Sequence, residues 1–451
     1  MSKQRHLVAL IFSVGVALGS WGQAMPGATE IGQAGRGGGS FEFWANQRSN
    51  ALQSSFIQTM NAGGFISRDF LGDFLSSHPL MGGMGVQVGW SKRWSTKPLG
   101  GQWALTGELG SELLCSAMWR RDLLELVYLG NAGHLGRVDQ FSGSGIRLGA
   151  FNRISAGIEN TGTRQRLELS VVQRIVGFEM GIPNGSFWVS SSADSMEVNM
   201  QAYAQASLDD LPDSSGFTFR DLIPAYGIGL SGSLPLTSEL WPLQFQVDFK
   251  DVGIMWEPAG GVIGAIDTGF ATTGLSVPLA AYFNEEYESE QITLEDLVNG
   301  ETGLAVDSIL LVSDSAMGRM LMLPTQIKAQ LTWWPVPDVQ VRAMARAGSW
   351  MPEPEFTLGV GWIPTKRWAF GLDFRSGGWG GPRPVTWMDF RVSKKRILSL
   401  EVDDPAGWFW NSEASGNAYG RGIRLSLRRL PGNQWTRYMG LPQMEIGRKQ
   451  P

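Results

Sequence analysis

The feature that most constrains the fold is an alternation of apolar and polar residues that recurs along most of the chain. Residues 243–250, LQFQVDFK, show it clearly, because every odd-numbered residue is apolar and every even-numbered residue is polar. Successive side chains point to opposite faces of a β-strand, so this segment has one apolar face and one polar face. The apolar face must contact either the core of a soluble sheet or lipid.

The same period returns in many segments after residue 85. Short turn sequences such as KPLGG, PVPD and IPTK separate some of them, and longer connections separate others. This order is typical of β-hairpins in series. The segments are 86–91, 103–109, 167–171, 196–203, 243–250, 327–333, 339–346, 356–362, 368–374, 385–392, 397–402 and 423–428.

Three properties of these segments favour lipid over a soluble core. Their length of about 8–12 residues matches the roughly 9–11 that a tilted membrane strand needs. Their polar faces carry charged residues, which a barrel places in its lumen. Aromatic residues stand near the segment ends, where interfacial girdles form. The tryptophans expected there are Trp241, Trp256, Trp333, Trp334, Trp362, Trp368 and Trp387. We therefore predict an all-β fold, a transmembrane antiparallel β-barrel of roughly 14 strands.

The beginning of the chain resembles a secretory signal peptide. Lys3 and Arg5 precede an apolar run at 7–18, and Gly22-Gln23-Ala24 forms a small-x-small cleavage site, so we expect cleavage after residue 24. Residues 25–83 lack a regular pattern apart from a short helix expected at 67–76. We interpret them as an N-terminal extension that either plugs or caps the barrel or forms a periplasmic segment, and a disordered leader is the alternative. The expected barrel spans 84–430, and 431–451 form a C-terminal tail.

The composition excludes several classes of function. A formal net charge of −5 argues against nucleic-acid binding, and Cys115, the single cysteine, cannot form an internal disulfide. No spaced cluster of His and Cys indicates a metal, and no cofactor motif is present. Only His78 and His134 remain after signal cleavage, and neither stands in a catalytic motif. We expect no catalytic, cofactor-binding or metal-binding residues.

Charged residues on the polar faces of the C-terminal segments are the candidate lumenal set. They are Arg342, Arg346, Asp373, Arg375, Arg391, Arg424 and Arg428. Two interpretations remain open for the arginines. They guide an anionic solute, as charged rings do in pores, or they pair with acidic residues of neighbouring strands and lock a plugged barrel. We favour the locking interpretation. The expected acidic partners are Asp248, Asp373, Asp389 and Glu401.

Three motifs resemble an uncharacterised outer-membrane β-barrel family of Bacteroidetes-type bacteria, domain-of-unknown-function family 5723. They are DLLELVYLGNAGHLGR at 122–137, YGIGLSGSL at 226–234 followed by FQVDFKDVGIMW at 245–256, and LEDLVNG at 294–300 followed by LPTQIKAQLTWW at 323–334. The motif residues of interest are Asp122, Gly130, Asn131, Asp251, Gly253 and Trp256. Glycine suits a bulge at Asp251–Gly253, although a turn at the end of a strand is the interpretation we favour. Gly130-Asn131 suits a turn with positive φ.

The resemblance implies a non-enzymatic barrel, similar in outline to fatty-acid-transporter-like barrels and to accessory barrels of the type IX secretion system. We therefore expect a protein of the cell outer membrane that contacts its lipid. It passes or binds a hydrophobic or small solute, or serves as a structural or secretion-accessory component beside other cell-envelope proteins. Two alternatives are a secreted soluble β-sandwich, acting as an adhesion or matrix protein, and an outer-membrane enzyme.

Overall fold

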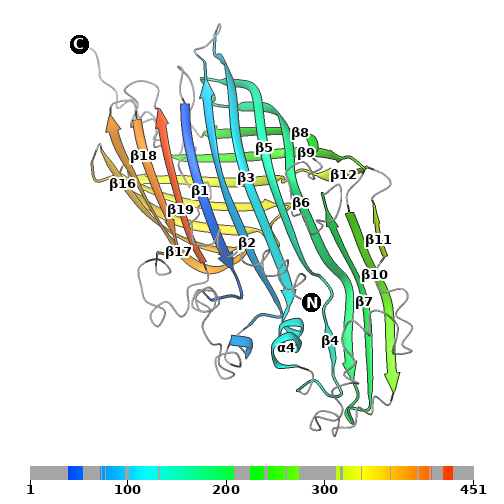
Figure 1. The fold of residues 1–451 in the computed structure, drawn as a ribbon. Helices are drawn as coiled ribbons and strands as arrows, with labels where there is room; N and C mark the ends of the chain where they lie inside the picture. The colour runs from blue at the N-terminus through cyan, green and yellow to red at the C-terminus, as the bar shows by residue number, and fades with distance from the viewer. Residues whose placement is uncertain are drawn as a thin grey trace, which may run out of the picture.

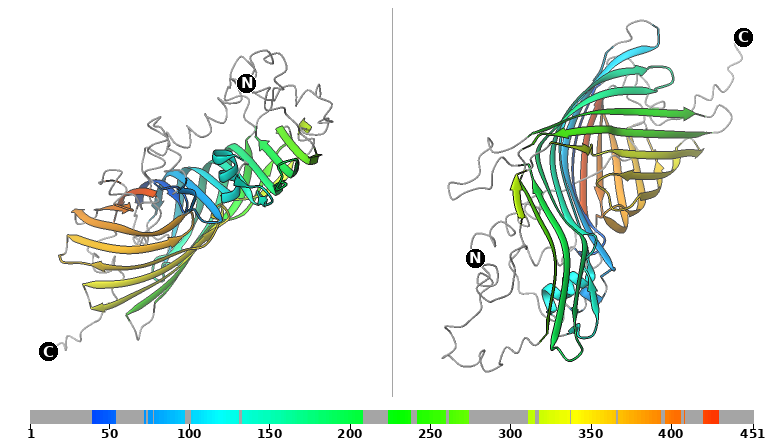
Figure 2. Two further views of the ribbon diagram at one scale, coloured as in Figure 1. Left: turned by 90° about the horizontal axis from the view of Figure 1, so that it is seen from below. Right: turned by 90° about the vertical axis from the view of Figure 1, so that its right-hand side faces the viewer.

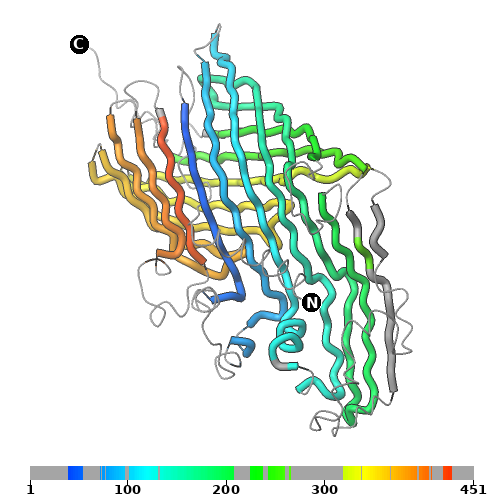
Figure 3. Tube along the Cα trace, viewed as in Figure 1, coloured from blue at the N-terminus to red at the C-terminus, as the bar shows by residue number. Residues whose placement is uncertain are grey.

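Fourteen antiparallel strands close into a barrel in the computed structural model of this chain (Figure 1). The last strand, β19 (Gly420–Arg429), pairs with the first, β1 (Gly39–Ser49), as Figure 3 shows for the red and blue ends of the colour scale. Closure leaves no strand edge in hydrocarbon with unsatisfied amides. The remaining strands are β2 (Met81–Ser95), β3 (Trp103–Arg120), β5 (Ser144–Asn160), β6 (Arg166–Val189), β8 (Ala225–Thr237), β9 (Leu243–Glu257), β13 (Gln326–Val336), β14 (Val339–Gly348), β15 (Glu355–Trp362), β16 (Trp368–Gly377), β17 (Gly380–Ser393) and β18 (Arg396–Asp403).

The structure describes sixteen stretches of the chain. They are residues 39–53, 72, 74–76, 78–96, 101–130, 133–207, 224–237, 242–259, 262–273, 311–314, 318–336, 338–365, 367–393, 396–405, 408 and 420–429. The expected signal peptide, the C-terminal tail, most of the expected helix at 67–76, the LEDLVNG motif and Trp241 lie outside these residues. Within them, no helix has the length and apolarity to cross a membrane.

The outer surface of the barrel is apolar and its inner surface is polar. On β15, Phe356, Leu358 and Val360 face outward and are 60%, 61% and 51% exposed, whereas Glu355 and Thr357 face inward and are buried. A soluble sheet would bury the apolar set instead. The fold is therefore a transmembrane β-barrel, as the alternation predicts, and the soluble-sandwich alternative is wrong.

The two ends of the barrel differ in the length of their connections. At one end, called the turn end here, short connections join β2 to β3, β5 to β6, β8 to β9, β13 to β14, β15 to β16 and β17 to β18. At the other end, called the long-connection end, the chain between β9 and β13 runs from residue 258 to residue 325. The first residue of β1 and the last residue of β19 both lie at the turn end (Figure 1).

Part of the same 19-stranded sheet, called the second sheet here, extends beyond the barrel at the long-connection end (Figure 2). The first half of β6 pairs with β8 in the barrel, and its second half pairs instead with β7 (Ser195–Ala206) and β4 (Val138–Gln140). Beyond β7 follow β10 (Val262–Thr273) and β11 (Leu311–Asp314), while β12 (Arg319–Met322) pairs with the end of β9. Leu123 and Leu126 of the helix α4 (Arg121–Leu129) pack against Phe141, Phe187 and Val189.

The prediction of an N-terminal extension over 25–83 is wrong for its described strand residues. β1 lies between β19 and β2 in the barrel wall, and β2 begins at Met81 rather than after residue 83. The reason is that β1 does alternate, with Phe41 and Phe43 exposed outward and Glu42 and Arg48 buried inward. The neighbouring glycines and the polar inner face hide this pattern in the sequence.

Two of the expected girdle tryptophans also face the wrong way. Trp256, Trp333 and Trp362 are 50%, 44% and 56% exposed on the outer surface, as interfacial residues should be. Trp334 and Trp387, however, are buried in the barrel interior. Both residues stand at positions whose side chains point into the barrel. Their closeness to a strand end does not show to which face they point.

Candidate functional site

The candidate site is the lumen, because the predicted charged set faces it. Among these residues, Arg391 lies half-buried at the end of β17, and its Nε donates a hydrogen bond to the Ser393 carbonyl. The others are between 0% and 3% exposed on the inner surface: Arg342, Arg346, Asp373, Arg375, Arg424 and Arg428. The lumen is therefore a packed interior at these positions.

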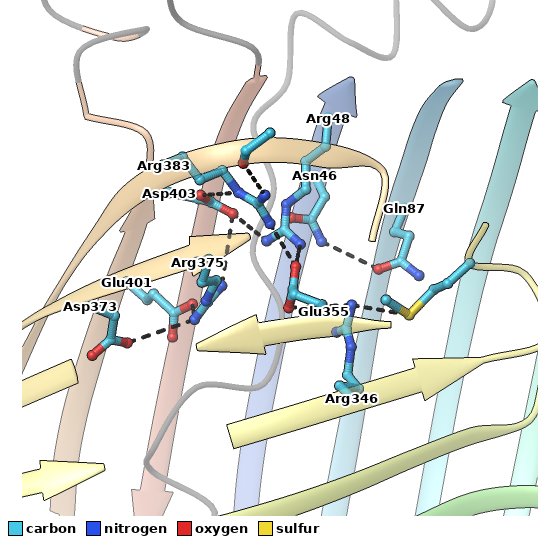
Figure 4. A network of polar contacts seen from close by, with 12 residues as sticks. Asn46, Arg48, Gln87, Arg346, Glu355, Asp373, Arg375, Arg383, Glu401 and Asp403 are labelled. Carbon is cyan, nitrogen blue, oxygen red and sulfur yellow. Dashed lines mark hydrogen bonds and ion pairs between the residues drawn. The ribbon is translucent and has the colours of Figure 1, made fainter. Parts of the chain in front are cut away.

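A network that we call the arginine layer crosses the lumen near the long-connection end (Figure 4). It joins six strands through four arginines and four carboxylates: Arg48, Arg346, Arg375, Arg383, Glu355, Asp373, Glu401 and Asp403. Two arginines of the layer contact the same carboxylate oxygen. Arg383 Nη2 lies 2.6 Å from Glu355 Oε2, and Arg48 Nη1 lies 2.8 Å from it.

Burial of this network makes its pairing obligatory. All eight side chains are nearly excluded from water, and Glu355 accepts contacts from Arg48, Arg346 and Arg383. An isolated charge in such a place costs several kcal/mol, whereas a paired and hydrogen-bonded charge is tolerated. The layer therefore ties β1 to β14–β18 across the barrel interior.

Further ion pairs join inward residues of neighbouring strands. Arg342 Nε lies 3.0 Å from Asp373 Oδ1, and Arg375 Nη2 lies 2.6 Å from Glu401 Oε1, so two of the expected acidic partners are contacted. Asp248 pairs with Lys328 at 2.8 Å rather than with an arginine. Asp389 lies buried on the inner face of β17. Arg424 reaches Glu42 of β1 at 2.6 Å, across the seam that closes the barrel.

An apolar cluster fills the lumen beside the arginine layer. Trp350, from the connection between β14 and β15, and Trp379, from the turn between β16 and β17, both fold inward. We call these two residues the tryptophan plug. Trp379 donates a 2.9 Å hydrogen bond from Nε1 to Ser116 Oγ on β3, and Trp350 stacks edge-on against Phe151. The cluster is completed by Leu114, Val172, Ala225, Met255 and Leu323.

Asp251 marks a bulge inside β9 and not the strand-end turn that we favoured. The register with β8 shifts between Leu230 and Gly232, and Asp251 adopts φ = 53° while fully buried. Its Oδ1 accepts hydrogen bonds from Arg153 Nε at 2.9 Å and from Ser170 Oγ at 3.2 Å. These bonds hold the positive φ, which aspartate tolerates better than most residues.

The other motif residues surround this bulge or lie outside the barrel. Gly253 follows the bulge where β9 lies against Ile228, whose carbonyl leaves no room for a side chain. Trp256 faces outward. Asp122 lies in the first turn of α4, and Gly130 ends that helix with φ = 74°, as a turn requires. Asn131 lies outside the described residues.

Both histidines contact polar partners, although neither stands in a catalytic motif. His134 Nδ1 lies 2.8 Å from Asp139 Oδ2, in a cluster held by Arg137 beside α4. His78 Nε2 accepts a hydrogen bond of 2.9 Å from Trp119 Nε1, and burial lowers the pKa of His78. Within the described residues, no group of three or more His, Cys, Asp or Glu side chains could hold a metal ion.

Several residues of the lumen escape sequence reasoning. Three of them face inward: Arg48, Glu355 and Arg383. Arg48 lies in β1, which the sequence does not predict as a strand, and the other two lie at or near the start of a strand. Trp379 belongs to the sequence GGWGG, whose glycines indicate a turn. No local signal shows that this turn folds into the barrel.

Comparison with known proteins adds no family. No family model matches the chain, and no curated protein matches it. Among solved structures, the toluene transporter TbuX of Ralstonia pickettii is 9% identical, with 92% of this chain and 96% of that chain covered and a TM-score of 0.37. A Pseudomonas aeruginosa FadL homologue is 9% identical, with 92% and 98% covered and a TM-score of 0.36. The Pseudomonas putida toluene transporter TodX is 8% identical, with 87% of each chain covered and a TM-score of 0.31. At these TM-scores, conclusions about this chain rest on its own strand pairing.

Proposed function

We propose that the protein is a non-enzymatic barrel of the outer membrane that binds or passively passes a hydrophobic or small solute. The observation that carries the proposal is the apolar cluster around Trp350 and Trp379 inside a lumen whose buried residues are largely polar or charged. A barrel with a purely structural role does not require an apolar zone beside a network of ion pairs. A hydrophobic solute fits that zone because it can replace the contacts that the tryptophans make.

The connections of the barrel indicate its orientation. Outer-membrane barrels have short turns on the periplasmic side and long loops outside the cell. The turn end then faces the periplasm, and the long-connection end, with the second sheet, faces outward. In this orientation the tryptophan plug lies near the outer mouth, so a solute from outside meets it first.

A second candidate function is a closed structural or secretion-accessory barrel, which contacts other envelope proteins and carries no solute. The arginine layer favours it, because ion pairs among six strands stabilise one closed arrangement. The likeness to family 5723, which rests on the short motifs alone, is compatible with either candidate.

Conductance in planar bilayers tests the proposal. We expect the refolded full chain to insert with little conductance, and Trp379→Ala to give steady conductance because it opens the lumen. Trp362→Ala is the matched control, since Trp362 is 56% exposed to lipid and should leave the lumen unchanged. Uptake of the apolar fluorescent probe N-phenylnaphthylamine into proteoliposomes, measured on the same three proteins, reports on hydrophobic solutes.

Each outcome decides between the candidates. Faster probe uptake and steady conductance in Trp379→Ala alone support the solute function. Clean insertion with no conductance and no uptake in any protein supports the structural barrel. Failure of every variant to insert overturns the membrane assignment.

A further inference from the structure

We propose that Arg147 of β5 is the positioning residue that keeps Trp350 inside the lumen, and that Glu179 and Tyr203 connect it to the second sheet. The proposal rests on the solute function above, because it assigns a regulation to the apolar cluster that Trp350 helps to fill. We call these four residues the latch. They form a chain of contacts at the long-connection end, through which the second sheet controls how firmly Trp350 is held.

Two contacts of Arg147 hold the connection between β14 and β15, residues 349–354, to a distant strand. The guanidinium lies over the Trp350 ring, 4.9 Å from its centroid, and Arg147 Nη1 donates a hydrogen bond of 3.3 Å to the Ser349 carbonyl. The strands β6, β8, β9 and β13 lie between β5 and β14 in the barrel wall. A guanidinium over an indole ring attracts it electrostatically. Arg147 therefore holds Trp350 over the lumen from another part of the wall.

The connection is fixed to its own side of the barrel at Ser349. The Ser349 amide donates a hydrogen bond of 2.9 Å to the Thr325 carbonyl, and its hydroxyl donates one of 3.1 Å to the Leu323 carbonyl. Trp350 follows this anchor and packs into the apolar cluster. Apolar packing has no direction, whereas the contacts of Arg147 define one position of the ring. Because β14 ends at residue 348 and β15 begins at residue 355, release of Trp350 leaves the strand pairing intact.

Glu179 connects Arg147 to the second sheet. It lies directly opposite Arg147 in the β5–β6 ladder, and its Oε1 is 3.5 Å from Arg147 Nε. The same oxygen accepts a hydrogen bond of 3.0 Å from the Tyr203 hydroxyl on β7. The Tyr203 ring lies against Gly181, where an added Cβ would be 2.9 Å from its Cε1. One carboxylate oxygen therefore joins an arginine at the barrel mouth to a tyrosine of the second sheet.

The exposure of the latch makes it weaker than the arginine layer. The side chains of Arg147 and Glu179 are 44% and 27% exposed, whereas the arginine layer is nearly excluded from water. Exposed ion pairs contribute little to stability and are screened by salt. The latch can therefore release Trp350 under conditions in which the arginine layer stays paired, as a gate requires.

Electron paramagnetic resonance on the refolded full chain in lipid vesicles tests the latch. A nitroxide is attached at Glu353→Cys in a Cys115→Ser background, because Glu353 is an exposed residue of the connection that carries Trp350. Arg147→Met should increase the mobility of the label and raise the frequency of channel openings in planar bilayers on the order of tenfold. Arg147→Lys should recover part of the restraint, since it keeps the charge. Tyr203→Phe should act like Arg147→Met but more weakly, by about twofold.

Salt dependence separates positioning from a merely structural role. Screening weakens the pair of Arg147 and Glu179, so the label on the wild-type background should become more mobile from about 0.05 M to about 1 M sodium chloride. Glu179→Gln removes the pair and should abolish this dependence. Arg396→Gln is the matched control, because Arg396 is an exposed residue at the start of β18, at the turn end. It should match the wild type in label mobility and in openings.

The two readouts separate the latch from the solute function, and heat-modifiable gel mobility shows that each variant is folded. Greater label mobility in Arg147→Met but not in Arg396→Gln supports the latch, with or without more frequent openings. Absence of openings in both Arg147→Met and Trp379→Ala counts against the solute function alone. Equal label mobility in the wild type and Arg147→Met, or a salt dependence that persists in Glu179→Gln, overturns the latch.

Discussion

Replacement of Gly85 by alanine should expel Trp379 from the lumen. Gly85 faces inward on β2, and a Cβ built there would overlap the Trp379 ring, with Cε2 only 2.6 Å away. The overlapped atoms belong to the rigid indole, so the side chain cannot yield by moving a flexible end. It must change rotamer or shift its whole turn. A single methyl group therefore tests whether the tryptophan plug closes the barrel.

The magnitude follows from two opposing effects. Overpacking of a filled interior costs about 1–3 kcal/mol of unfolding free energy. Alanine in place of glycine restricts the unfolded chain and recovers about 0.4–1 kcal/mol, because Gly85 does not need a positive φ. We expect a net loss of about 1–2 kcal/mol. The displaced indole also loses its hydrogen bond to Ser116, so the lumen should open at this point.

Urea unfolding in lipid vesicles measures the stability, and planar-bilayer conductance measures the opening. Gly381→Ala is the control, since a Cβ at Gly381 meets no atom within 4 Å. It should be neutral or slightly stabilising and should leave conductance at the wild-type level. If Gly85→Ala is as stable and as closed as Gly381→Ala, Trp379 does not pack against β2 and the plug is refuted.

Three further predictions concern other parts of the structure. Arg48→Met should lower the free energy of unfolding in urea by about 3–5 kcal/mol, because it leaves Glu355 and Asp403 short of a partner. The control Arg121→Met, whose partner Glu125 is partly exposed, should lower it by less than about 1 kcal/mol. Similar losses in the two variants would contradict the stabilising role of the arginine layer. Asp251→Ala should destabilise the barrel by about 3 kcal/mol or more, since Arg153 loses its nearest carboxylate and alanine resists positive φ, whereas Asp251→Asn should cost less. Equal losses in urea unfolding would show that the charge and the side-chain bonds of Asp251 are irrelevant. Burial lowers the pKa of His78 below 6.5, so its contribution to stability is complete above about pH 6.5 and decreases as the pH falls below that value. The wild-type protein should therefore lose more unfolding free energy between pH 7.5 and 5.5 than His78→Gln. Parallel pH profiles of the two proteins would show that His78 does not cause the pH dependence.

The sequence alone determines the barrel and the orientation of its faces. Side-chain direction alternates with every residue in a strand, so the period of two assigns Phe356 and Leu358 to lipid and Arg342 and Arg375 to the interior. That assignment needs no knowledge of neighbouring strands. Tightly turned hairpins such as β13–β14 and β17–β18 are predictable for the same reason, because their register follows from a short connection.

Only the tertiary structure decides what fills the lumen. Arg48 meets Glu355 and Asp403 across more than 300 residues of sequence, and Arg424 meets Glu42 only because β19 closes on β1. The turn that carries Trp379 folds inward because Gly85, four strands away on β2, leaves space for the ring. Such contacts depend on strand register, barrel closure and interior volume. These are properties of the whole sheet, and no segment of the sequence contains them by itself.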